Sequence, residues 1–214
     1  MNQFVKEFTE SKVIVICRGI PEEEIVNVAT ALYEGGIRFM EVPFNQADPA
    51  SFAHTARNIK AVKAALGDKM HVGAGTVITM EQFAIAKEAG AEIIVSPTME
   101  EDIIAATKAA GLISMPGCAT PSEMTKAYKL GADLIKLFPA SQVTLKVIKE
   151  IRVPLNHLKL VCFGGVTADN IQEVLATGVV GVGVASSVLD KKALAEKDYG
   201  KITALAKALT QQIG

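Results

Sequence analysis

The chain has 214 residues, of which 50% are hydrophobic and 21% are charged, and its formal net charge at pH 7 is -1. This size and composition predict one globular domain over residues 1–214, with enough apolar side chains for a substantial core. The near-zero charge and the lack of Trp argue against nucleic-acid binding, and no apolar run reaches the roughly 18 residues of a membrane span.

The three cysteines, Cys17, Cys118 and Cys162, are odd in number and lack the spacing of metal ligands. Because the N-terminus also does not resemble a signal peptide, free thiols in a reducing cytoplasm are expected. Cys118 lies in a Gly-Cys-Ala-Thr turn and is either a reactive thiol or, as we expect, part of the core. The three histidines form no i, i+4 pair, so no metal site is expected.

Short apolar runs alternate with amphipathic segments from one end of the chain to the other. Strands are expected at 13–17, 39–42, 71–73, 93–95, 112–115, within 131–139, and at 158–162 and 179–184. The intervening helices are expected to start near Pro21, to span 49–65, to open at Thr79, Met99 and Thr120, to span 143–151, to open at Thr167 and to follow Asp198. At Thr79, a Gln three residues later predicts a capping box.

Eight strand–helix units in about 200 residues, with nearly continuous Val, Ile and Leu in the strands, are typical of parallel sheets buried on both faces. The predicted fold class is therefore α/β, a single closed (β/α)8 TIM barrel. No linker or low-complexity segment interrupts the series.

A lysine interrupts the apolar strand expected between Gly131 and Pro139. Lys136 stands in the middle of this run. An ammonium group there is costly to bury unless it is paired or its pKa falls enough to release the proton. A neutral lysine amine is a nucleophile that forms Schiff bases with carbonyl substrates. The alternative is a strand-end lysine whose ammonium reaches solvent.

In four segments a helix-ending glycine precedes a strand, and the fifth residue after it lies near the strand's C-terminal end. These segments are 36–41, 90–95, 131–136 and 178–183. Because they belong to alternate strands, which share interior layers in a barrel, Glu41 and Lys136 are expected to point inward at similar height near the catalytic mouth. A structural buried ion pair is the alternative.

Two glycine-rich turns follow the last two strands. They are Phe163-Gly164-Gly165-Val166-Thr167 and the segment 181–187, which ends in Ser186-Ser187. In such barrels the loops after strands seven and eight commonly bind phosphate through backbone N–H groups. A phosphate site is therefore predicted here; in the alternative interpretation Gly181 and Gly183 relieve crowding in the barrel and Gly164-Gly165 is only a turn.

Two further polar residues follow early strands. Thr76, after Gly73-Ala74-Gly75, is a candidate contact for a substrate carboxylate or carbonyl, and Arg18 is a candidate anion contact at the same mouth. A structural threonine and a surface arginine are the alternatives.

The ordered motifs resemble those of the class I aldolases that cleave 2-keto-3-deoxy-6-phosphogluconate (KDPG), also described as 4-hydroxy-2-oxoglutarate (KHG) aldolases. The resemblance covers nearly the full length. It is carried by Arg18-Gly19-Ile20, Glu41-Val42-Pro43, Gly73-Ala74-Gly75-Thr76, Ser96-Pro97, Pro116-Gly117, Lys136-Leu137-Phe138-Pro139, Gly164-Gly165-Val166 and Asp198-Tyr199.

The resemblance implies a lyase that splits a phosphorylated keto acid into pyruvate and glyceraldehyde 3-phosphate. Lys136 would be the Schiff-base lysine, and Glu41 the general acid/base, working through a water. No cofactor or metal is implied, because the protonated imine is the electron sink for the carbanion.

The same resemblance implies that Thr76 and Pro97 line the pyruvate pocket and that Gly164, Gly165 and Ser186 hold the phosphate. It also implies a homotrimer and a place in Entner–Doudoroff carbohydrate metabolism.

Two positions depart from the family pattern. Asn45 stands where many members carry an arginine that binds the pyruvyl carboxylate, and Phe163 stands where many carry a threonine. Without that bidentate clamp, carboxylate binding must rely on Thr76, backbone groups or Arg18. Three segments resemble the branch that acts on the 6-phosphogalactonate epimer, so both C4 epimers stay open. They are Arg18-Gly19-Ile20, Pro43-Phe44-Asn45 and Gly117-Cys118-Ala119-Thr120.

Two other functions share the phosphate loops. A phosphosugar isomerase or epimerase needs a paired acid/base or metal set, which the sequence does not show. A non-catalytic sugar-phosphate binder would keep the scaffold without turnover.

Overall fold

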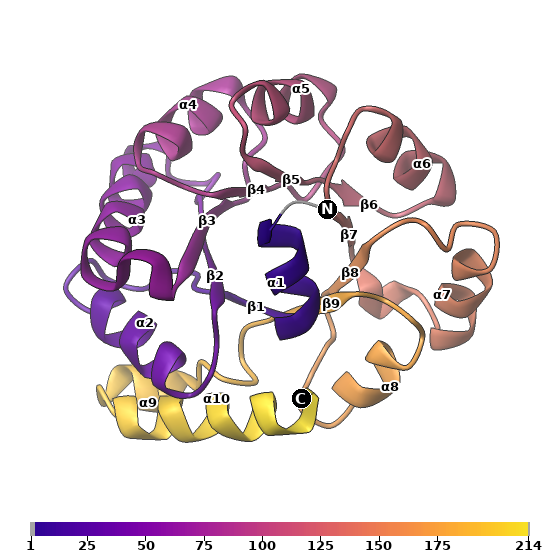
Figure 1. Ribbon diagram of the computed structural model, residues 1–214. Helices are drawn as coiled ribbons and strands as arrows, with labels where there is room; N and C mark the ends of the chain where they lie inside the picture. Colours follow the sequence, from indigo (N-terminus) through magenta and orange to yellow (C-terminus); the bar gives the residue numbers. More distant parts are fainter. Residues whose placement is uncertain (1–2, 214) are drawn as a thin grey trace.

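The strands of the computed structural model, which describes residues 3–213, form one parallel sheet that curves into a barrel (Figure 1). Within this range the strands are β1 (Val13–Ile16), β2 (Phe39–Pro43), β3 (His71–Gly75), β4 (Ile93–Val95), β5 (Ile113–Met115), β6 (Gly117–Cys118), β7 (Ile135–Leu137), β8 (Leu160–Phe163) and β9 (Gly181–Val184). Their order is β5-β4-β3-β2-β1-β9-β8-β7-β6.

The two ends of this sheet are parts of one strand that Pro116 interrupts. Proline lacks the N–H that a strand ladder needs, which separates β5 from β6. The chain still closes the barrel here, because the Lys136 N–H donates to the Pro116 carbonyl (2.9 Å) and the Leu134 N–H donates to the Ser114 carbonyl (3.1 Å). The predicted (β/α)8 barrel is therefore confirmed, with its fifth strand split in two.

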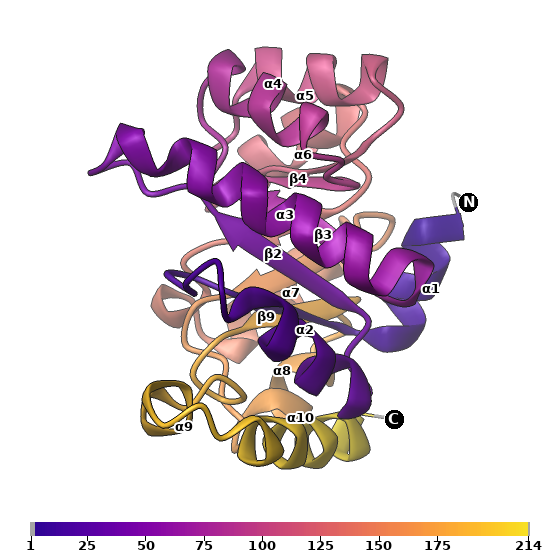
Figure 2. The same cartoon turned by 90° about the vertical axis from the view of Figure 1, so that its left-hand side faces the viewer.

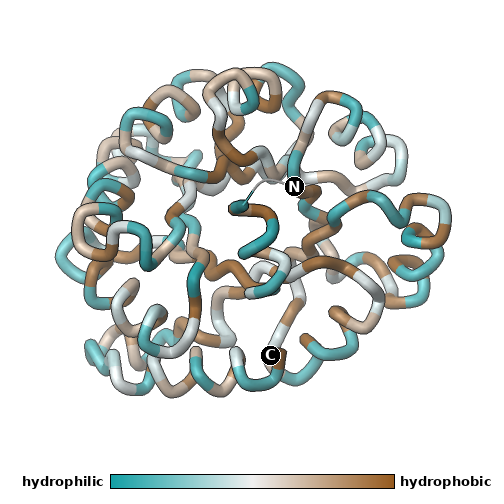
Figure 3. Tube along the Cα trace, viewed as in Figure 1, coloured by the Kyte–Doolittle hydropathy of each residue, from teal (hydrophilic) through white to brown (hydrophobic). Residues whose placement is uncertain are grey.

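The helices form a ring outside the strands (Figure 1). They are α2 (Ile25–Glu34), α3 (Phe52–Leu66), α4 (Met80–Glu88), α5 (Glu101–Ala109), α6 (Pro121–Lys129), α7 (Leu145–Arg152), α8 (Ile171–Leu175), α9 (Lys191–Ala195) and α10 (Tyr199–Ile213), with 3-10 turns η1 (Pro49–Ser51), η2 (Gly67–Lys69) and η3 (Ala140–Gln142). The strands are mostly hydrophobic, whereas the helices alternate between hydrophobic and hydrophilic residues (Figure 3).

The helix ends follow local sequence signals, with three corrections, one of which is that α8 begins at Ile171 rather than at Thr167. Thr120 and Glu123 form a reciprocal capping box at α6, and the glycines before β2, β4, β7 and β9 adopt positive φ. They are Gly36, Gly90, Gly131 and Gly178, at 88–96°. The capping box predicted at Thr79 is only half formed, because the Gln82 side chain accepts from the Ile78 N–H instead. Helix α2 begins at Ile25, after a turn, rather than at Pro21.

An additional helix, α1 (Gln3–Ser11), covers the N-terminal end of the barrel. It lies over the centre of the ring in Figure 1 and, in Figure 2, at the end away from the β2 arrowhead. The rings of Phe4 and Phe8 meet that of Phe39 edge to face, with centroids 5.1 and 5.2 Å apart. This packing closes one end, which leaves the C-terminal mouth as the open one.

The three cysteines are free and buried. Burial raises the pKa of the Cys118 and Cys162 thiols to about 12, so neither is a thiolate near neutral pH. The expected core role of Cys118 is confirmed. Among the described helices, none is both long and apolar enough to cross a membrane.

Candidate active site

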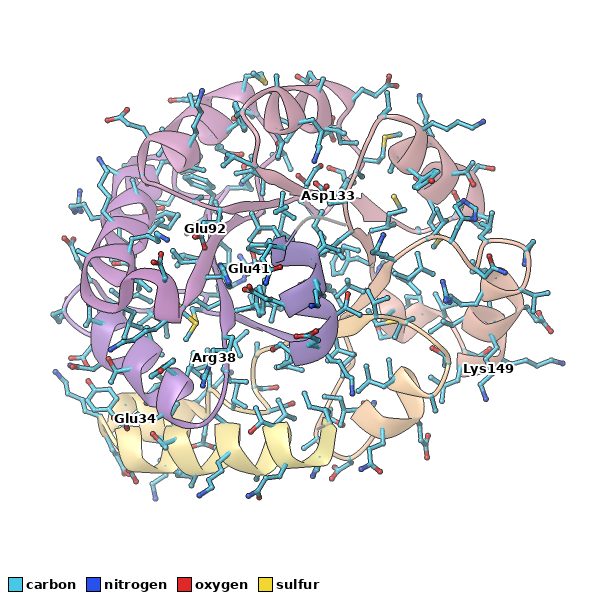
Figure 4. The ribbon with its side chains drawn as sticks, viewed as in Figure 1. Glu34, Arg38, Glu41, Glu92, Asp133 and Lys149 are labelled. Atoms are coloured by element: carbon cyan, nitrogen blue, oxygen red, sulfur yellow. The ribbon has the colours of Figure 1, made fainter. Side chains whose placement is uncertain are left out.

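Lys136 and Glu41 point into the barrel from β7 and β2. Their strand neighbours, among them Met40 and Ile135, pack in the layer between strands and helices. Because successive side chains of a strand alternate between faces, the two charged residues lie on the inner face, and Figure 4 shows Glu41 inside the ring of strands. Only 2% of Glu41 and 7% of Lys136 is exposed.

The Glu41 carboxyl group is buried and incompletely satisfied. Its Oε2 atom has no hydrogen-bond partner within residues 3–213. It packs against Gly75, where any side chain would overlap the carboxylate. Burial raises the pKa of Glu41, and the positive charges of Lys136 and Arg18 only partly offset this effect. The carboxyl group can therefore hold or release a proton closer to neutral pH than an exposed glutamate.

The Lys136 ammonium lies among aromatic rings. Its Nζ is 4.6 Å from the Phe163 ring centroid and 4.8 Å from that of Phe138. Burial lowers the pKa of Lys136, the charge of Arg18 lowers it further, and Glu41 opposes both. A lysine that reaches solvent is therefore ruled out. An uncompensated buried carboxylate oxygen also does not fit a purely structural ion pair.

Inward-facing glycines make room for these side chains. A side chain at Gly183 would overlap the Phe163 ring, and one at Gly181 would meet Phe8 and the Lys12 carbonyl. The packing interpretation of Gly181 and Gly183 is therefore confirmed. Phe163, from β8, consequently lies beside Lys136 and shields its amine from water.

Arg18 and Thr76 meet at the mouth. The Arg18 Nη2 donates to the Thr76 Oγ1 across 3.3 Å, which joins the loops after β1 and β3. Arg18 is exposed, and its charge acts on both Glu41 and Lys136. The guanidinium is therefore available to an anion beside the reacting groups.

Asn45 and Pro97 lie in the loops after β2 and β4. Asn45 is exposed, and its Oδ1 accepts from the Ala47 N–H (3.2 Å), so it caps a turn in its own loop. Pro97 is half-buried, with its carbonyl against Gly117. In the part of the chain that the structure describes, no hydrogen bond or ion pair joins either residue to the two buried charges.

The loops after β8 and β9 start side by side, because Phe163 pairs with Gly183. Gly164 and Gly165 have φ of 92° and 75°, which favours glycine. The N–H groups of both glycines, and that of the exposed Ser186, make no hydrogen bond with another described residue. These free donors suit an anion.

Cleft size alone would not identify this site. Clefts of about 260 and 370 Å³ meet at the rim and share residues 18–20. A cleft of about 420 Å³ lies at the opposite end, lined by Glu7, Arg38 and His71, and contains none of the predicted site residues. The buried charges therefore locate the chemistry at the mouth. Residues 3–213 contain no group of three or more His, Cys, Asp or Glu that could hold a metal.

Sequence reasoning missed several residues that shape the mouth. Gln46 and Gln82 brace the Thr76 loop, and Asn170 braces the double-glycine loop by donating to the Gly165 carbonyl (2.9 Å). Amide side chains carry no periodic or charge signal, so only the capping pattern at Gln82 pointed to any of them.

The comparisons with known proteins agree with this geometry. The family model described as KDPG and KHG aldolase matches residues 5–205. A probable 2-dehydro-3-deoxy-6-phosphogalactonate aldolase from Rhizobium meliloti is 36% identical over 84% of this chain and 82% of its own. The 2-dehydro-3-deoxy-6-phosphogalactonate aldolase of Escherichia coli is 29% identical over 96% and 98%.

A solved structure shows the same fold. KDPG aldolase from Legionella pneumophila, with pyruvate captured as a covalent carbinolamine intermediate, matches with a TM-score of 0.86 and 28% identity over 97% of this chain and 98% of that one. These similarities argue against the isomerase and non-catalytic alternatives. The chain belongs to the KDPG and KHG aldolase family of carbon–carbon lyases.

Proposed function

We propose that the protein cleaves a phosphorylated 2-keto-3-deoxy sugar acid into pyruvate and glyceraldehyde 3-phosphate through a Schiff base on Lys136. The observation that carries this proposal is the pairing of a buried lysine of lowered pKa with a buried glutamate of raised pKa in one barrel interior. The lowered pKa favours the neutral, nucleophilic amine of Lys136, and the raised pKa lets Glu41 give and take a proton closer to neutral pH than an exposed glutamate would.

The first half of the reaction forms the imine. The neutral Lys136 amine attacks the ketone carbon and gives a carbinolamine, whose hydroxyl leaves as water when Glu41, directly or through a water, supplies a proton. The product is a protonated imine that links Lys136 to the substrate. Phe163 and Phe138 border the amine and limit the access of bulk water to it.

The second half breaks the carbon–carbon bond. Glu41 takes the proton of the C4 hydroxyl, the C3–C4 bond breaks, and its electron pair moves into the imine to give an enamine. Glyceraldehyde 3-phosphate leaves, a proton returns to C3, and water hydrolyses the imine to release pyruvate and free Lys136.

The ends of the substrate are proposed to lie on opposite sides of these groups. Arg18 and Thr76 are assigned to the keto-acid carboxylate, which suits their joined donors, and Pro97 is assigned to the wall of the pyruvate pocket. Gly164, Gly165 and the remaining N–H donors after β8 and β9 are assigned to the phosphate.

Ser186 is assigned to the same phosphate, as a hydroxyl and N–H donor. Asn45 is assigned to the substrate rim rather than to the carboxylate, because it caps its own turn.

For the substrate, we propose the 6-phosphogalactonate epimer, supported by the relatives of that name. Pyruvate release is measured from both C4 epimers side by side, without added metal. Preference for the galactonate epimer is expected, and preference for KDPG would overturn this choice in favour of the Entner–Doudoroff substrate. Release from neither, with turnover of unphosphorylated 4-hydroxy-2-oxoglutarate, would refute the phosphorylated substrate.

A homotrimeric state and a cytoplasmic location are also proposed, from the family resemblance and the buried free thiols. Light scattering during size exclusion should give about three times the chain mass of 22.6 kDa. A mass of one or two chains would contradict the trimer.

A further inference from the structure

Two glutamines connect helix α4 to the rim of the mouth. Gln82 is 1% exposed, and its Oε1 accepts from the Ile78 N–H (2.8 Å). Its Nε2 donates to the Gln46 Oε1 (2.8 Å), and the Gln46 Nε2 donates to the Thr76 carbonyl (2.8 Å). The two amides therefore form one continuous bridge between backbone groups of the loop that follows β3.

The direction of this bridge is fixed by its ends. The Thr76 carbonyl can only accept and the Ile78 N–H can only donate. The Gln46 amide nitrogen must therefore face Thr76, which leaves its oxygen for the Gln82 amide nitrogen and the Gln82 oxygen for Ile78. All three bonds form only in this arrangement, so neither amide is free to turn over.

The bridge acts on a residue in an unfavourable conformation. Thr76 has φ of 57°, where a β-branched side chain is rarely found. Its loop is also tied by the Val77 N–H to the Val95 carbonyl (3.2 Å). Residues of this kind persist only where their surroundings fix them, and the Gln46–Gln82 bridge holds the backbone on both sides of Val77 next to Thr76.

The position of Thr76 in turn sets its hydrogen bonding. Arg18 donates to the Thr76 Oγ1, which occupies an oxygen lone pair and leaves the hydroxyl proton for another acceptor. An arginine N–H and a hydroxyl proton directed to one place form a two-point site for a carboxylate.

We infer that Gln46 and Gln82 are positioning residues for the carboxylate end of the substrate, acting through Thr76 and Arg18. This inference rests on the proposed function. It also gives a route to carboxylate binding although Asn45 is turned into its own loop. The loop after β2 then contributes no charged side chain to the carboxylate, but its Gln46 holds Thr76, which contacts Arg18.

The test uses three variants of the full-length protein. Gln46→Met breaks the bridge at its exposed residue, and Gln82→Met breaks it at its buried residue. Gln82→Glu keeps an acceptor for the Ile78 N–H but cannot donate to Gln46. Gln172→Met is the matched control, because it also removes a glutamine donor to a backbone carbonyl (3.1 Å to Gln212) at an exposed site on α8.

The readouts separate the two ends of the site. The inhibition constants of pyruvate and of glyceraldehyde 3-phosphate are measured with kcat and KM for cleavage. Loss of one well-placed hydrogen bond should raise the inhibition constant of pyruvate about tenfold and raise KM by a similar factor. Binding of glyceraldehyde 3-phosphate and kcat should change less than about twofold, because the phosphate loops and Lys136 are untouched.

The positioning role would be overturned if the variants bound pyruvate and glyceraldehyde 3-phosphate equally more weakly. It would also be overturned if Gln46→Met and Gln82→Met bound pyruvate as tightly as the wild-type protein. Full rescue by Gln82→Glu would also overturn it, by showing that only the Ile78 bond matters. The proposed function fails in a different way: the wild-type protein would then release no pyruvate from any keto acid tested.

Discussion

Alanine at Gly75 tests whether the position of the Glu41 carboxyl group matters for turnover. A side chain at Gly75 overlaps the Glu41 carboxylate, whereas one at Gly73, two residues earlier on β3, overlaps Ile93 and lies 2.8 Å from its carbonyl oxygen. Both glycines are buried and face the interior. Gly73→Ala is therefore a matched control for crowding.

Gly73→Ala should cost at least as much stability as Gly75→Ala, because its methyl group meets the Ile93 backbone as well as a side chain, but it should cost less activity. Forcing a methyl group into a packed interior costs about 1–3 kcal/mol. Only Gly75→Ala moves the acid/base group, and removal of such a group costs about 10²–10⁴ in rate. We therefore expect kcat to fall at least ~100-fold in Gly75→Ala and less than ~10-fold in Gly73→Ala.

The assay combines urea unfolding with coupled detection of pyruvate release. Stability is compared first, so that activity is read only from folded protein. Near-normal kcat in a folded Gly75→Ala protein would refute the argument, because the carboxylate cannot stay in place beside the new methyl group.

Three further predictions concern ionisable side chains. Lys136→Met should abolish turnover but stay folded, since it replaces an ammonium that is costly to bury with an apolar side chain of similar length beside the Phe138 and Phe163 rings; a variant that does not fold would contradict this. Glu41→Gln should stay folded but lose at least ~100-fold in kcat, measured by pyruvate release; near-normal kcat would contradict its role. The His71 ring nitrogens lie 2.9 Å from carboxylate oxygens of Glu92 and Glu7, and these contacts raise the pKa of His71. Hydrogen bonds from Gln3 and His71 lower the pKa of Glu7, and those from His71 and Lys63 lower the pKa of Glu92 although burial opposes them. The contribution of His71 to the folding stability is therefore fully present below about pH 6.5 and is lost as the pH rises through the raised pKa. The contribution of the two carboxylates is present above about pH 4.5 and is lost as the pH falls below it. The free energy of unfolding, measured with urea at several pH values, should fall as the pH rises above about 6.5, and this fall should be smaller in His71→Gln. An equal fall in His71→Gln would refute the role of His71.

The barrel was predictable because its signals are local and repeated. Glycines before alternate strands mark the register, with positive φ in the structure, and this register alone predicts that Glu41 and Lys136 point inward. The split of the fifth strand was not predicted, although Pro116 supplies its cause. Helix α1 was also missed, because its few apolar residues find their partners, such as Phe39, only in the assembled barrel.

The polar surroundings of the site were less predictable than its charges. A lysine in an apolar strand is anomalous in sequence, but the bridge from Gln82 through Gln46 to Thr76 joins loops that only the fold brings together. Likewise, the sequence marked Phe163 as a departure from the family pattern, but its place beside the Lys136 amine depends on Gly183.

The most direct test of the central claim is borohydride reduction in the presence of pyruvate, followed by peptide mass analysis. If Lys136 forms the Schiff base, reduction should leave one stable pyruvate-derived adduct, located on Lys136 and absent from Lys136→Met. An unmodified protein, or an adduct on another lysine, would contradict the account.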